Sequence, residues 1–176
     1  MEPRIFIAQI IGLVAVSLSF VTYQMKSKSG VMIMLSLATT LFCIHYSILG
    51  ATTGLVLNIV GIIRNICYCF RDKKPMSGVA VPIILAAIMT VMSIFTWEGY
   101  HSIFFVVGLS LNTLAAGYFS PQGLRKSLLL TCTLILIYDA LIPGNPSWSG
   151  ILNESVAMIS AIVGIIRFRK KDEAKA

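Results

Sequence analysis

Residues 53–70 read TGLVLNIVGIIRNICYCF, an apolar run interrupted by Asn58, Arg64 and Asn65. A helix needs about 20 mostly apolar residues to cross the hydrocarbon core of a bilayer. Polar and ionisable residues inside such a segment are costly, and they usually face a protein interior or a watery cavity. The run therefore predicts a membrane-spanning helix with a hydrophilic face.

Apolar runs of similar length fill the chain on both sides of this one. We expect seven spanning helices, at residues 5–23, 31–49, 53–70, 79–97, 102–119, 127–142 and 150–168. The composition agrees, because 57% of the residues are hydrophobic and the mean hydropathy is +0.87. Only 12% are charged, against about 25% in an average soluble domain. The sequence predicts an all-α integral membrane protein with no room for a soluble catalytic domain.

The basic residues predict the orientation in the membrane. They lie in alternate gaps between the expected helices, near Lys26, Arg71, Arg125 and Arg167, and Arg4 is the one exception. Basic loops face the cytoplasm, so we expect a periplasmic amino terminus and a cytoplasmic carboxyl terminus. This placement accounts for the net charge of +7 without a nucleic-acid partner.

The chain contains an internal repeat of three expected helices. Gly12, YQMKS at 23–27, HY at 45–46 and GLVLN at 54–58 recur in the same order as Gly108, PQGLRKS at 121–127, IY at 137–138 and GILNE at 150–154. The expected helix at 79–97 has no counterpart. Three helices leave the chain on the other side of the membrane, and this fourth helix returns it, so both units have the same orientation and are related by an axis along the membrane normal. We therefore expect a first bundle at 1–74, a linker helix at 75–99, a second bundle at 100–171 and a cytoplasmic tail at 172–176.

Three-helix bundles repeated about a linker helix, with Pro121-Gln122 at the end of a first helix, resemble the SWEET and PQ-loop (MtN3-like) transporters. More closely, the chain looks like the YgjV-type bacterial inner-membrane proteins over its whole length. The resemblance implies the bacterial inner (plasma) membrane. It also implies a hinge at Pro121 and Gln122, matched by Gln24 in the first unit, where the proline is missing. Finally, it implies substrate-binding asparagines at Asn58 and Asn153.

Other polar residues within the expected helices are candidates for the site. Arg64 lies roughly 9 Å along the helix from Asn58, so both could line one cavity. Arg64 would bind an anionic group there, or it would snorkel toward the cytoplasmic headgroups. Glu154 adjoins Asn153 and is a further candidate for binding the solute or a proton, or it would be an interfacial charge in water. Asn112 would line a pocket between the units or bridge two helices.

Two residues are candidates for proton coupling. His45 could titrate near neutral pH, or it could be a hydrogen-bonded structural histidine. Asp139 lies toward the outer surface of the second unit, where it would carry a proton or be an interfacial charge in water. Neither residue belongs to a metal-ligand pattern.

The cysteines give no sign of a metal or cofactor. Cys43, Cys67, Cys69 and Cys132 lie within the apolar runs and lack the paired spacing of a zinc site. We expect buried free thiols and no cofactor.

The leading hypothesis is a secondary transporter or facilitator of a small polar solute, which works by alternating access at a site between the two bundles. The alternative is a seven-helix receptor, binding or structural membrane protein without transport activity. An intramembrane enzyme using His45, Asp139 or Glu154 is disfavoured, because no nucleophile with an adjacent base is apparent. The expected partners are the solute and the lipid bilayer, and the sequence leaves a homo-oligomer open.

Overall fold

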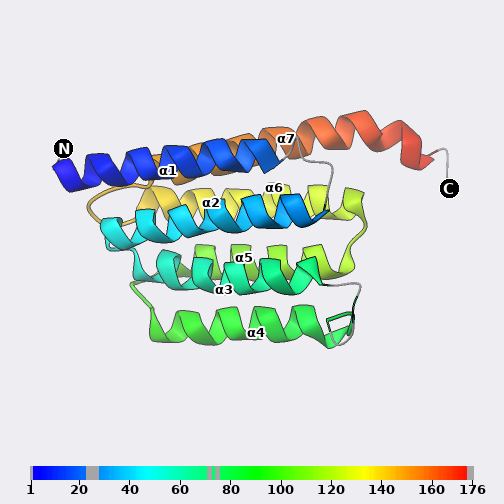
Figure 1. Cartoon of the computed structure of the whole chain (residues 1–176), viewed down its shortest axis with the longest axis horizontal. Coiled ribbons are helices and arrows are strands. Elements are labelled where there is room, and N and C mark those ends of the chain that lie inside the picture. The colour runs from blue at the N-terminus through cyan, green and yellow to red at the C-terminus, as the bar shows by residue number, and fades with distance from the viewer. Residues whose placement is uncertain (1, 23–27, 71–72, 74–75, 174–176) are drawn as a thin grey trace.

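The computed structural model describes residues 2–22, 28–70, 73 and 76–173. Within these residues the chain forms seven α-helices and no strand, which confirms the all-α fold. The helices are α1 (Pro3–Thr22), α2 (Lys28–Leu49), α3 (Thr52–Cys69), α4 (Ala80–Phe95), α5 (Ser102–Tyr118), α6 (Pro121–Leu141) and α7 (Trp148–Glu173). They run alternately in opposite directions, so the start of α1 and the end of α7 lie at opposite ends of the molecule (Figure 1).

α6 and α7 extend furthest beyond the expected apolar runs. α6 begins at Pro121 rather than at 127, because Ser120 caps it by accepting a hydrogen bond from Gly123 N at 3.2 Å and proline is well tolerated in a first helical turn. α7 continues through the basic residues to Glu173, into the segment that we expected to be a tail. In both cases polar turns prolong an apolar helix.

The outward surfaces of the helices are apolar. Of the described helices, three are long and apolar enough to cross a membrane, at Pro3–Val21, Thr52–Cys69 and Trp148–Arg167, and shorter apolar helices occupy Ile33–Leu49, Ala80–Phe95 and Ser102–Tyr118. Isoleucines such as Ile94 and Ile166 are 67% and 70% exposed. Contiguous apolar surface of this kind marks an interaction site or a membrane. The chain is therefore an all-α membrane protein.

Six of the helices form a ring. α1, α2 and α3 pack side by side as a first triplet, and α5, α6 and α7 pack in the same order as a second triplet. α1 contacts α7 and α3 contacts α5, which closes the ring, while α4 packs outside against α3 and α5 (Figure 1). Among the described residues α2 and α6 make no backbone contact, and they lie on opposite sides of the ring.

A cluster of aromatic side chains packs at one end of the ring. We call this the outer end; it holds the turns at 50–51, 96–101 and 142–147, and the opposite end is the inner end. Here the ring centroids of Phe105 and Tyr138 lie 4.5 Å apart. Glu98 caps α3 by accepting hydrogen bonds from the backbone nitrogens of Thr52 and Thr53 at 2.6 and 3.0 Å, where a helix favours negative charge. These contacts fix the start of α3 and therefore the depth of Asn58.

Candidate functional site

A cavity of about 540 Å³ occupies the middle of the ring, which is within the usual range for a small-molecule site. All six ring helices contribute to its lining, whereas no described residue of α4 does. Its wall combines apolar side chains with hydroxyl, amide, thiol and charged groups. The residues with polar or thiol groups are Ser19, Thr39, Tyr46, Asn58, Arg64, Asn112, Thr131, Cys132, Asn153 and Glu154.

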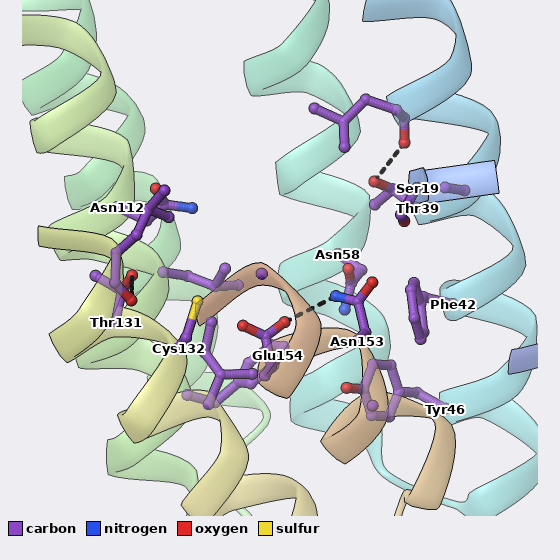
Figure 2. Close-up of a pocket in the computed structure, with 18 of the residues that line it drawn as sticks. Ser19, Thr39, Phe42, Tyr46, Asn58, Asn112, Thr131, Cys132, Asn153 and Glu154 are labelled. Atoms are coloured by element: carbon purple, nitrogen blue, oxygen red, sulfur yellow. Dashed lines mark hydrogen bonds between the residues drawn. The ribbon is translucent and has the colours of Figure 1, made fainter. Parts of the chain in front are cut away.

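All five residues that we predicted to bind the solute line this one cavity: Asn58, Arg64, Asn112, Asn153 and Glu154. They come from α3, α5 and α7, which belong to both triplets. Figure 2 shows Asn58, Asn112, Asn153 and Glu154 around the same space. The ring therefore gathers residues that are up to 96 positions apart in the sequence, from Asn58 to Glu154 (154 − 58).

Asparagine side chains offer free hydrogen-bonding atoms to the cavity. Asn58 Nδ2 donates to Gly54 O at 2.8 Å, which orients the amide, and Asn58 Oδ1 accepts no hydrogen bond from the described residues. Asn153 Nδ2 donates to Glu154 Oε1 at 3.0 Å. Asn112 makes no side-chain hydrogen bond to the described part of the chain. Of its two expected roles, the structure therefore supports lining a pocket and not bridging two helices.

Arg64 turns toward α5 rather than along its helix to the inner surface. Its Nε and Nη2 donate to Asn65 Oδ1 at 3.3 and 3.1 Å, and its Nη1 donates to Thr113 Oγ1 at 3.3 Å. No carboxylate among the described residues forms an ion pair with it. Of the two alternatives for Arg64, the structure shows the cavity-lining one.

Side chains from both triplets close the outer end of the cavity. Tyr46 OH of α2 donates to Asp139 Oδ1 of α6 at 2.7 Å, and Gly54 N of α3 donates to Tyr138 OH of α6 at 3.0 Å. Tyr46 is 3% exposed, and Tyr138 and Asp139 are fully buried. We call Tyr46, Gly54, Tyr138 and Asp139 the outer seal. At the inner end the lining residues Ser19, Leu35 and Leu128 are partly exposed.

The two expected proton-coupling residues lie outside the cavity lining. Asp139 is fully buried, so the interfacial alternative, a charge in water, is wrong; its Oδ2 has no hydrogen-bond partner among the described residues. His45 is also fully buried, with Nδ1 2.8 Å from Ala8 O and Nε2 2.8 Å from Ser147 Oγ. Because a carbonyl only accepts, Nδ1 carries a proton, and in the neutral ring Nε2 then accepts from Ser147 Oγ. His45 therefore fastens α1 and α2 to the turn before α7.

The expected hinge residues have different outcomes. Gln24 lies outside the described residues. Pro121 is the first residue of α6, a position where proline does not kink a helix. Gln122 Nε2 donates to Ile165 O of α7 at 3.3 Å, and Gln122 Oε1 accepts from Arg125 Nη1 at 3.1 Å. Gln122 therefore ties the start of α6 to α7.

Sequence reasoning missed the closing role of the outer seal. Tyr46 and Tyr138 occupy matching positions in the two repeat units, and each bonds to the opposite triplet. That matching position was the available signal. It also missed that Cys132, which is a buried free thiol as expected, lies beside Glu154 in the cavity wall (Figure 2). Within the described residues, no group of histidine, cysteine and acidic side chains could hold a metal ion.

The comparison with known families agrees with the membrane character of the fold. Residues 6–172 match the family model Imp-YgjV, described as a bacterial inner membrane protein. This match confirms the resemblance to the YgjV-type proteins, while the likeness to SWEET and PQ-loop transporters stays a prediction. No curated protein and no solved structure matches the chain.

Proposed function

Because the chain belongs to the Imp-YgjV family of bacterial inner membrane proteins, we propose that it is a secondary transporter or facilitator of a small polar solute. The observation that carries this proposal is the cavity between the two triplets, lined by polar residues of both and closed at its outer end. Polar and charged groups at such depth are costly without partners. Binding a polar solute would supply those partners.

The proposed transporter consists of a first bundle at 1–74 and a second at 100–171, joined by a linker at 75–99. The neighbour pattern of the helices supports this division. If α1, α2 and α3 are matched with α5, α6 and α7, the contact between α1 and α7 corresponds to the contact between α5 and α3. The order of the helices within each triplet is also the same. α4 lies outside the ring, as a linker would. Rocking of one bundle against the other would then open either end of the cavity.

Opening the outer end requires hydrogen bonds between the bundles to break, among them the two bonds of the outer seal, Tyr46 to Asp139 and Gly54 to Tyr138. In the present conformation both are formed, so the conformation corresponds to an inward-facing or closed state of the proposed cycle. The proposed topology has seven crossings, with the outer end in the periplasm and the carboxyl terminus in the cytoplasm, and the basic loops support it.

Proton coupling is assigned to Asp139 in this proposal. Breaking the outer seal would expose its carboxyl group to periplasmic water, and closure would bury it again without a described cationic partner. A buried unpaired carboxylate is unfavourable, so closure favours uptake of a proton. His45, with both ring nitrogens bonded, serves as a fastening residue.

Labelling of Cys132 tests alternating access directly. The other three cysteines are changed to serine, and a membrane-impermeant methanethiosulfonate reagent is added to either side of oriented membrane vesicles. We expect labelling of Cys132 from both sides, slower from the outside, and a faster outside rate in Tyr46→Phe. The matched control is Tyr100→Phe, since Tyr100 is 74% exposed outside the seal.

A receptor or structural protein would expose Cys132 to one side at most. Outside labelling that is absent in the parent and unchanged by Tyr46→Phe would therefore contradict the transport proposal.

A further inference from the structure

The cavity contains one cationic and one anionic side chain, and neither has an oppositely charged partner among the described residues. Arg64 bonds only to the neutral groups of Asn65 and Thr113, at 3.1 to 3.3 Å. Glu154 likewise accepts hydrogen bonds only from neutral groups, the amide of Asn153 at 3.0 Å and the thiol of Cys132. Both charges line the cavity wall.

The ring holds these two charges apart. Arg64 lies on α3 with its guanidinium bonded to α5, whereas Glu154 lies on α7. α7 packs against α1 and α6 and has no backbone contact with α3 or α5 in the described residues. The two charges therefore lie on opposite walls, where they do not neutralise each other directly.

The cost of these charges constrains what fills the cavity. Arg64 and Glu154 are both partly exposed in the cavity wall, so water can solvate them while the cavity is empty. A solute that displaces this water has to compensate each charge, because an unpaired charge without water is strongly unfavourable. A neutral solute would leave both uncompensated, and a simple anion or cation would leave one. A solute with both signs of charge compensates both at once.

We propose that the solute is a small zwitterion whose anionic group binds Arg64 while its cationic group binds Glu154. The proposal rests on the cavity being the binding site, as proposed above. A guanidinium can bind a carboxylate or phosphate through two parallel hydrogen bonds. The free Oδ1 of Asn58 provides an additional acceptor for an ammonium group. Because the charges lie on opposite walls, the favoured zwitterion has several bonds between its ends.

A panel of matched ligands tests this in the purified full-length protein. Glycine, 4-aminobutanoate and 6-aminohexanoate differ in charge separation, while butanoate, butylamine and butanamide lack one or both charges. Binding is followed by thermal shift and by protection of Cys132 from labelling. We expect the best zwitterion to bind at least about tenfold more tightly than the singly charged and neutral probes, which corresponds to about 1.4 kcal/mol.

Two charge-removing variants then assign the ends of the ligand. Arg64→Gln is expected to bind the zwitterion no more tightly than butylamine, because the site for the anionic group is lost. Glu154→Gln is expected to bind the zwitterion no more tightly than butanoate, because the site for the cationic group is lost. Arg4→Gln and Glu2→Gln remove the same charges from an exposed ion pair and are expected to change neither preference. If Arg64→Gln does not fold, Arg64→Lys keeps the charge and is expected to retain the zwitterion preference with weaker binding.

The outcomes separate this inference from the transport proposal. If the unmodified protein binds butanoate or butylamine as tightly as it binds every zwitterion, the zwitterion assignment is overturned. This holds even if labelling of Cys132 shows alternating access. A zwitterion preference without alternating access would support the assignment and identify a binding protein instead.

Discussion

At the scale of single residues, replacing Asn58 tests whether the cavity binds a solute. Its only described side-chain bond is to Gly54 O in its own helix, so Asn58→Ala is expected to cost at most about 1 kcal/mol of stability. It should abolish protection of Cys132 by the zwitterions. Melting temperature and labelling rate measure the two effects.

The matched control on the same helix is Ile59→Ala, whose side chain is 46% exposed away from the cavity. Normal protection of Cys132 in Asn58→Ala would exclude Asn58 from the site.

A second prediction concerns the charge of Asp139. Asp139→Asn keeps an acceptor for Tyr46, so we expect slow outside labelling of Cys132 as in the parent, but loss of any acceleration of solute uptake by an imposed proton gradient. Asp139→Ala removes the acceptor and should speed outside labelling. Proton-driven uptake that persists in Asp139→Asn would remove Asp139 from coupling.

The sequence predicted the cavity residues better than it predicted the seal. Asn58, Arg64 and Glu154 stand out because a polar side chain within an apolar run needs an interior to face. The bond between Tyr46 and Asp139 joins residues that are 93 positions apart, and no local pattern encodes that distance. Buried serines such as Ser147 are inconspicuous in sequence for the same reason.

At the scale of helices, the apolar runs predicted the positions of the elements because hydrophobic length is a local property. They could not predict that α6 starts at Pro121, since that start depends on capping by Ser120 and lies outside the apolar core. α7 likewise continues into basic residues, which are good helix formers despite their polarity. Hydropathy therefore marks the membrane-embedded part of a helix and not its ends.

The two glycines of α3 give a prediction about packing at the outer seal. A Cβ at Gly54 would lie 2.9 Å from Tyr138 OH and 2.9 Å from the Tyr46 ring, whereas a Cβ at Gly61 would meet only Thr39 Cγ2 at 3.9 Å. Gly54→Ala should destabilise the protein by about 1–3 kcal/mol through overpacking. It should also speed outside labelling of Cys132.

Gly61→Ala is the control, because it makes the same chemical change on the same helix in ordinary contact. It is expected to be neutral or to stabilise by up to about 1 kcal/mol. Thermal unfolding in detergent and the labelling rate distinguish the two. Equal behaviour of both variants would mean that the close approach at Gly54 has no role in closure.

At the scale of the whole molecule, the ring explains how a short chain encloses a polar space. Two triplets with identical neighbour order meet through α1–α7 and α3–α5, which leaves α2 and α6 apart. Sequence similarity between the units predicted two bundles, yet it did not specify which helices would meet. Those contacts depend on packing between units, for example the near contact of Gly12 with Ser149.

The orientation of the whole molecule gives the last prediction. The seven crossings that we propose would put the termini on opposite sides, and the basic loops predict that the inner end lies in the cytoplasm. Fusions of green fluorescent protein after residue 74 or 171 should fluoresce, and fusions of alkaline phosphatase after residue 50 or 145 should be active. Each reporter serves as the control for the other at the same site. Active phosphatase after residue 171 would contradict this prediction, because it would mean that the molecule is inverted or has fewer crossings. In an inverted molecule the outer seal would face the cytoplasm.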